Sequence, residues 1–187
     1  MFAVDASGSI GSSNFRKVLN FVADVTTHYD INKISGTQVG IVRFASSASR
    51  IISLPQYQSN ADLKNAILRI RYTGGGTATH SAIQAARNEF KANGRSSAHK
   101  VLVIVTDGKS NSFSSTTSQA KLARDEGMKI FAIGIGSGIN LNELREVASD
   151  PDSKHVLTGD YTSQSFARLS QFLSNICKGE SEMVQRN

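Results

Sequence analysis

The sequence predicts an α/β protein in which helices cover both faces of a doubly wound, mostly parallel, six-stranded sheet with one antiparallel edge strand. Apolar strand-like runs alternate with amphipathic helical segments along the chain, which is the order that a parallel sheet requires. Residues 101–105 form a continuous apolar run rich in β-branched side chains, typical of a central strand buried on both faces. Residues 37–45 and 50–54 are two strand-like segments joined by a short turn, and Pro55 suits an edge strand.

The first half of the chain begins with an apolar strand at residues 2–4. We expect Ser12 or Ser13 to cap the following helix, which extends to about residue 29. Its apolar side chains recur at the spacing of one buried helix face: Phe15, Val18, Leu19, Val22 and Val25. After the hairpin, we expect Asn60 to cap a second helix, which ends before the glycine loop at residues 74–76.

The second half continues the same alternation. A helix is predicted from Thr79 to the Asn93-Gly94 pair, and a short helix is predicted after a cap at Asn140. The remaining predicted elements are strands at 100–106, 129–135 and 155–157, and helices at 114–126 and 166–176. We expect one domain over residues 1–178 and a loose polar tail over residues 179–187.

The composition is that of a globular domain with an uneven charge. Apolar residues make up 39% of the chain, and no apolar run approaches the roughly 18 residues that a membrane-spanning helix needs, so we expect no membrane insertion. The net charge is +6, and residues 1–100 carry most of the excess. Six basic residues are candidates for a surface that attracts acidic partners, although scattered solvated charges on helix faces are the favoured interpretation: Arg69, Arg71, Arg87, Lys91, Arg95 and Lys100. Trp is absent and no nucleic-acid-binding motif is found, so we expect no nucleic acid partner.

Three loops carry hydroxyl and carboxylate side chains. Asp5-x-Ser7-x-Ser9 follows the first strand, Thr77 follows the glycine loop, and Asp107 follows the central strand. Ligands of such sheets bind beyond the carboxyl ends of the strands, where Asp5 and Asp107 are expected. Oxygen ligands with two negative charges suit a hard divalent cation, and the compact hydroxyl set favours Mg²⁺ over Ca²⁺. Ca²⁺ and Mn²⁺ are kept as alternatives. Taken singly, the same residues can also cap helices or form local turns.

Together the three loops resemble the metal-ion-dependent adhesion site of the von Willebrand factor A and integrin I-domain family. The order, the spacing and the strand context all match, and the resemblance covers residues 2–178. It implies a Rossmann-like fold and a metal bound by Asp5, Ser7, Ser9, Thr77 and Asp107. It also implies a protein partner that completes the metal's coordination with an Asp or Glu side chain.

Two departures make the chain more similar to matrix A domains of the matrilin and collagen VI type than to integrins. The segment between residues 135 and 141 is too short for the extra helix of collagen-binding integrin I domains, and Lys109 stands where integrins commonly have Glu. The resemblance therefore implies a fragment of a larger secreted matrix protein, with collagen, another matrix protein or an acidic glycan as partner. It also implies that Cys177 is half of a disulfide to a cysteine outside the fragment. His80 and Lys109 are candidate contacts at the rim of the ligand site.

The motifs indicate binding rather than catalysis. Gly108-Lys109-Ser110 imitates the end of a phosphate-binding loop, but Val103 occupies the position where that loop needs glycine. No serine stands in a nucleophile elbow, and the four histidines do not pair with acids or cysteine. We therefore expect a cation-dependent adhesion domain and no enzyme. The alternative is a structural matrix module whose basic half binds acidic polysaccharide or a mineral-associated acidic protein, with an incidental metal site; an intracellular A domain is a third, less favoured interpretation.

Overall fold

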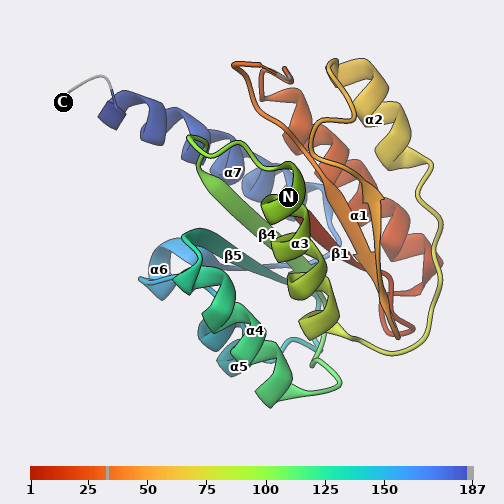
Figure 1. Ribbon diagram of the computed structural model, residues 1–187. Coiled ribbons are helices and arrows are strands. Elements are labelled where there is room, and N and C mark those ends of the chain that lie inside the picture. Colours follow the sequence, from red (N-terminus) through yellow and green to blue (C-terminus); the bar gives the residue numbers. More distant parts are fainter. Residues whose placement is uncertain (33, 185–187) are drawn as a thin grey trace.

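The computed structural model describes residues 1–32 and 34–184, with side chains as far as residue 175. The strands are β1 (Phe2–Asp5), β2 (Ile41–Phe44), β3 (Ala48–Ile52), β4 (Lys100–Thr106), β5 (Met128–Ile135) and β6 (Val156–Gly159). The helices are α1 (Gly11–Thr27), α2 (Asn60–Leu68), α3 (Thr79–Asn93), α4 (Phe113–Asp125), α5 (Leu141–Val147), α6 (Asp152–His155) and α7 (Ser163–Val184). Figure 1 shows their arrangement.

The described strands form one six-stranded sheet in the order β3-β2-β1-β4-β5-β6. Neighbouring strands are parallel except β2 and β3, which form the antiparallel hairpin at one edge. The predicted fold class is confirmed, including the edge hairpin and the central position of residues 100–106. The chain passes from one side of β1 to the other after β3, and this reversal of strand order places β1 beside β4.

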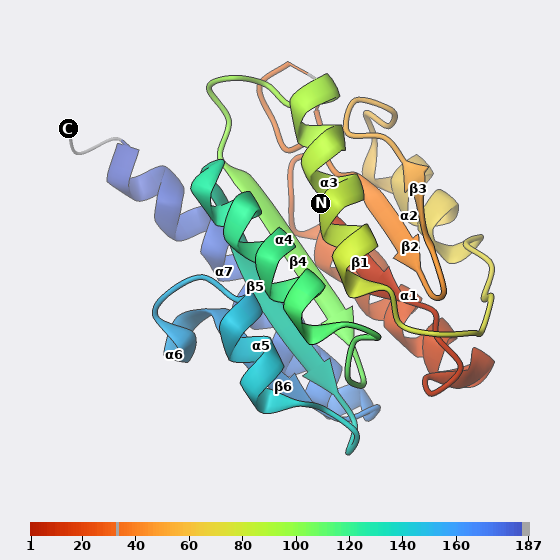
Figure 2. The same cartoon turned by 60° about the horizontal axis from the view of Figure 1, so that its bottom comes forward.

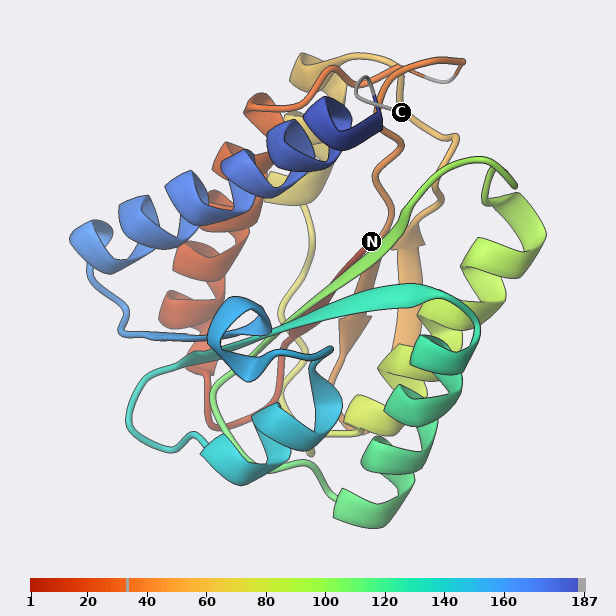
Figure 3. The same cartoon turned by 90° about the vertical axis from the view of Figure 1, so that its left-hand side faces the viewer.

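Helices cover both faces of the sheet, with α1, α2 and α7 on one face and α3, α4 and α5 on the other (Figure 3). The two faces have separate apolar cores because successive side chains of a strand point to opposite sides. In β1, Phe2 and Val4 pack with the α1 side, whereas Ala3 packs with the α3 side. The predicted inner face of the first helix, which includes Phe15 and Leu19, is completely buried. These cores fix β1 and β4 as neighbouring buried strands.

Two predicted helix caps are wrong. The first helix begins at Gly11, without a side-chain cap from Ser12 or Ser13. The cap of α2 is Ser59, whose extended backbone lets its hydroxyl accept a hydrogen bond from the backbone N–H of Asp62. The side chain of Asn60 instead donates to carbonyl groups at the C-terminal end of α1. Asn60, the first residue of α2, thus joins two helices rather than capping one.

The last helix is longer than predicted. α7 continues to Val184, through residues expected to form a loose polar tail. The side chain of Cys177 lies outside the described residues, so its predicted disulfide stays a prediction. No helix within the described ranges has both the length and the apolar character needed to cross a membrane.

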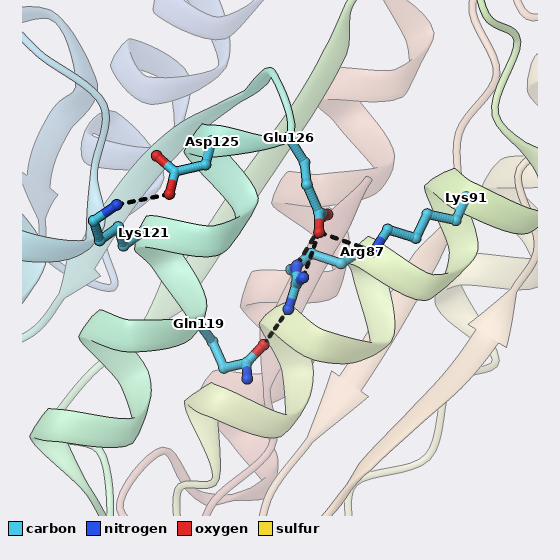
Figure 4. A network of polar contacts seen from close by, with 6 residues as sticks. All are labelled: Arg87, Lys91, Gln119, Lys121, Asp125 and Glu126. Carbon is cyan, nitrogen blue, oxygen red and sulfur yellow. Dashed lines mark hydrogen bonds and ion pairs between the residues drawn. The ribbon is translucent and has the colours of Figure 1, made fainter.

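A polar network joins α3 to α4 (Figure 4). The guanidinium group of Arg87 donates from Nε to Glu126 at 3.0 Å and from Nη1 to Gln119 at 2.6 Å. Lys91 forms a second ion pair with Glu126 at 2.8 Å. Arg87 and Lys91 therefore share one carboxylate, which compensates one of their two positive charges within the fold. The six basic residues considered from the sequence do not form one free surface.

Candidate metal centre

The three predicted loops lie at the same edge of the sheet. β1 and β4 are parallel neighbours, so Asp5 at the end of β1 and Asp107 just beyond β4 reach the same edge. Figure 2 shows this edge, where β4 and β5 end and the chain from α2 to α3 passes in front of the sheet. The topology therefore gathers residues that are about a hundred positions apart in the sequence.

Asp5 is completely buried and held at both carboxylate oxygens. Its Oδ1 accepts a hydrogen bond from the backbone N–H of Ser7 at 2.8 Å, and its Oδ2 accepts one from the Thr106 hydroxyl at 2.7 Å. Burial raises the pKa of Asp5 above its usual value and the charge of Asp107 adds to this, whereas the hydrogen bonds from Thr106 and Ser7 oppose it. The carboxylate is fixed in orientation, but its charge is not compensated.

Ser7, Ser9 and Asp107 form a continuous chain of oxygen atoms. The hydroxyl oxygens of Ser7 and Ser9 are 3.1 Å apart, and the Ser9 hydroxyl donates to Oδ1 of Asp107 at 2.8 Å. Ser7 and Asp107 are buried, whereas Ser9 is exposed. The structure therefore brings these three predicted residues together at a point that solvent can reach.

Thr77 is held beside this chain by its loop. The backbone N–H of Gly8 donates to the carbonyl of Gly75 at 2.8 Å, which joins the glycine loop to the Asp5–Ser9 loop. On its other side, Asn111 accepts from the Thr77 N–H through Oδ1 at 2.9 Å and donates its own N–H to the Thr77 carbonyl at 2.8 Å. Thr77 itself is 9% exposed. All three loops are thus tied to one another by hydrogen bonds.

Several supporting residues were missed by sequence reasoning. Asn111 connects two of the loops, the Tyr72 hydroxyl donates to the Ser7 carbonyl at 3.1 Å, and the Ser46 hydroxyl accepts from the Gly76 N–H at 2.8 Å. Thr106, the last residue of β4, also supports the site through its hydrogen bond to Asp5. Nothing in local spacing identifies Tyr72 or Asn111, because each acts on a loop far away in the sequence.

Tyr161, in the loop before α7, also approaches the site. Its hydroxyl is buried without a hydrogen-bond partner among the described residues. Burial raises the pKa of Tyr161, and the negative charges of Asp107 and Asp5 raise it further. The two carboxylates therefore create a negative field that extends beyond their own loops.

The two predicted rim residues lie at different depths. Lys109 is exposed two residues after Asp107. His80 is in the first turn of α3, three residues after Thr77, and its Nδ1 is buried without a partner among the described residues. Their role in ligand contact stays a prediction.

The donor set fits a hard divalent cation. Asp5 and Asp107 make no ion pair with any described lysine or arginine, although a buried carboxylate is costly unless its charge is compensated. Around them are neutral hydroxyl oxygens, which are ligands for Mg²⁺ and related ions. In the described part of the chain no cluster of three or more His, Cys, Asp or Glu side chains offers another metal site. The two positive charges of such a cation would compensate the two negative charges of Asp5 and Asp107.

The fold and this loop arrangement define a von Willebrand factor type A domain. The sequence matches this family over residues 1–175, so the chain belongs to it. The fold class and the resemblance to matrix A domains inferred from the sequence are confirmed.

Similar proteins include two vertebrate relatives. Vitrin of Mus musculus is 33% identical over 176 residues, which are 94% of this chain and 26% of vitrin. Cochlin of Homo sapiens is 33% identical over 179 residues, which are 95% of this chain and 31% of cochlin. The chain thus spans less than a third of the length of these relatives.

A similar solved structure is that of proximal thread matrix protein 1 from the mussel byssus, in which zinc occupies the metal-ion-dependent adhesion site. It superposes with a TM-score of 0.80 at 33% identity, over 94% of this chain and 43% of the mussel protein chain. A family member of this fold can therefore hold a divalent metal at its adhesion site.

Proposed function

We propose that the chain is a cation-dependent protein-binding domain of a secreted matrix protein. Asp5, Ser7, Ser9, Thr77 and Asp107 hold the cation, with Mg²⁺ as the expected ion and Ca²⁺ or Mn²⁺ as alternatives. The observation that carries the proposal is the hydrogen-bonded oxygen chain from Ser7 through Ser9 to Asp107, next to a buried carboxylate with uncompensated charge.

A bound divalent cation supplies a coordination position for a carboxylate of the partner. The protein's own residues prepare this position. Thr106 and the Ser7 N–H fix the orientation of Asp5, and Ser9 is exposed at the mouth of the site. Three of the proposed ligands are neutral hydroxyls that add no negative charge around the cation, which favours the approach of a further anion.

The partner we propose is an extracellular protein that presents Asp or Glu, with collagen or another matrix protein as the leading class. The mussel byssus protein and the vertebrate relatives support this assignment. His80 and Lys109 are proposed as contacts at the rim. The hydroxyl-rich site is proposed for binding and not for catalysis, because none of its groups forms a nucleophile and base pair.

Calorimetric titration of the purified domain with MgCl₂ tests the metal site. We expect one ion per chain for the wild type and no binding for Asp107→Ala, because this substitution removes a charge and the acceptor of the Ser9 hydroxyl. Asp125→Ala is the matched control, since it removes an exposed carboxylate of α4 whose ion-pair partner among the described residues is Lys121. Equal Mg²⁺ binding by both variants would contradict the proposed ligand set.

Solid-phase binding to fibrillar collagen, in Mg²⁺ or in excess chelator, tests the partner. We expect binding in Mg²⁺ that is lost in chelator and in Asp107→Ala. Circular dichroism should show that this variant keeps its fold, because the substitution lies at the rim of the sheet. Collagen binding that persists in chelator would refute the metal-bridged mode, even if the calorimetry shows a metal site.

A further inference from the structure

Arginine side chains from three parts of the fold meet at residues 68–71, the segment at the end of α2. Arg16 of α1 and Arg43 of β2 each donate a hydrogen bond to a backbone carbonyl of this segment. Arg69 and Arg71 belong to the segment and are exposed. Four guanidinium groups are thus attached to one short stretch of chain, which we call the arginine segment.

The charge of the arginine segment is not neutralised within the fold. None of its four arginines forms an ion pair with a described residue, and a hydrogen bond to a carbonyl leaves the full positive charge. This distinguishes the segment from Arg87 and Lys91, which share Glu126. The excess charge of the first half of the chain therefore gathers here, where it attracts an anionic partner.

A groove of about 670 Å³ lies between β3 and α2, next to the arginine segment. Its lining includes Arg69 and the half-buried ring of Tyr57. It also includes Gln58 and Asn65, whose side-chain amides make no hydrogen bond with a described residue. The volume is within the usual range for small-molecule sites. Free amide groups match sugar hydroxyls, and an aromatic ring offers an apolar surface for a sugar ring. Arg69 belongs to both the groove and the arginine segment, which makes them one continuous surface.

One acidic residue also lines the groove. Asp62 lies in the first turn of α2, where its carboxylate accepts a hydrogen bond from the Ser59 hydroxyl at 2.7 Å. The arginine segment lies at the opposite end of the same helix. The groove thus has a polar end near Asp62 and a strongly positive end at Arg69, which orients a chain with anionic groups.

We propose that the groove and the arginine segment bind a sulfated polysaccharide, independently of the metal centre. Guanidinium groups bind planar arrays of anionic oxygens, and the amide-lined groove receives the sugar backbone. Single-stranded nucleic acid is a poorer match, because it needs an aromatic platform for each of several successive bases, whereas Tyr57 is the single aromatic residue in the described lining of the groove.

Binding of a heparin octasaccharide in the presence of chelator tests the proposal. We expect the double variant Arg69→Gln/Arg71→Gln to bind about tenfold more weakly, the loss expected for two solvent-exposed ion pairs. Neither side chain makes a described contact that the fold needs. The matched control is Arg145→Gln/Lys154→Gln, which removes the same charge from α5 and α6, far from α2 (Figures 1 and 3). Its affinity should equal that of the wild type.

Two further measurements separate the site from general charge attraction. Asp62→Asn should bind the octasaccharide about two- to threefold more tightly, because one repulsive charge is removed while the amide still accepts from Ser59. A hyaluronan octasaccharide, which lacks sulfate, and a DNA duplex of equal charge should bind more weakly than heparin. Equal weakening in both double variants, loss of binding in chelator, or equal binding of the DNA would each overturn the proposal.

Discussion

Thr106→Val tests the support of the buried carboxylate of Asp5. Valine has the shape of threonine, so the substitution opens no cavity, but it removes the hydroxyl that donates to Oδ2 of Asp5 at 2.7 Å. Both residues are buried, with Thr106 4% exposed, so water cannot replace the lost donor. A hydrogen bond to a charged group contributes about 1.5–3 kcal/mol, and we expect the free energy of unfolding to fall by about 2 kcal/mol.

The measurement is denaturant unfolding in chelator at neutral pH. A loss of this size corresponds to a fall of about 4–8 °C in the melting temperature for a chain of this length. The matched control is Thr116→Val in α4, which removes a buried hydroxyl that has no partner among the described residues. This control should be neutral or slightly stabilising, because it removes an unsatisfied polar group.

The pH dependence gives a second test of the same bond. The pKa of Asp5 is raised by burial, and the loss of the Thr106 donor raises it further. The destabilisation by Thr106→Val should therefore be largest well above this pKa and should shrink as Asp5 becomes protonated at lower pH. Equal effects of Thr106→Val and Thr116→Val at all pH values would falsify the reasoning.

Three further predictions concern the α3–α4 network and the site loops. The pKa of Glu126 is lowered from 4.5 to about 2, mainly by its hydrogen bond with Arg87. After allowance for solvent screening, Glu126→Gln should lower the free energy of unfolding by about 1–2 kcal/mol at neutral pH. This loss should vanish as the pH falls from 4.5 towards 2, which acid unfolding curves of both proteins measure. Gly75→Ala should destabilise the protein by about 1–3 kcal/mol and weaken Mg²⁺ binding, because Gly75 has a φ of 97° and a Cβ there would lie 2.5 Å from the Ser46 hydroxyl. Thermal unfolding measures the first effect and calorimetry the second, and wild-type values in both would contradict the prediction. Asn111→Ala should speed amide exchange at residue 77 and weaken Mg²⁺ binding, and unchanged exchange would show that the loops do not depend on this side chain.

The order of strands and helices could be predicted because it depends on local apolar patterns. The continuous run of β4 and the one-sided pattern of α1 each match their burial in the structure. Helix ends were less predictable. Ser59 and Asn60 are both good cap residues, and only the extended backbone at Ser59 decides between them. The continuation of α7 beyond residue 178 has no apolar signal in the sequence.

The candidate site likewise contains residues that the sequence predicts and residues that it does not. The residues at strand ends were predictable, since parallel neighbouring strands bring Asp5 and Asp107 to one edge. The residues that hold the loops in place were not. Tyr72 and Asn111 act across the chain, and their partners depend on the final register and packing. Sequence spacing carries no information of that kind.

Gly76 and Asn111 lie in close contact, so a change at one position restricts what the other can be. A Cβ atom at residue 76 would lie 2.8 Å from Nδ2 of Asn111, too close for the two groups to remain where they are. A side chain at residue 76 would therefore displace the Asn111 amide that accepts from the Thr77 N–H, while the backbone bond from Asn111 to Thr77 could remain. Among related domains we expect the two positions to covary, so that a side chain at 76 is accompanied by a smaller residue at 111 and by a different tether for the loop.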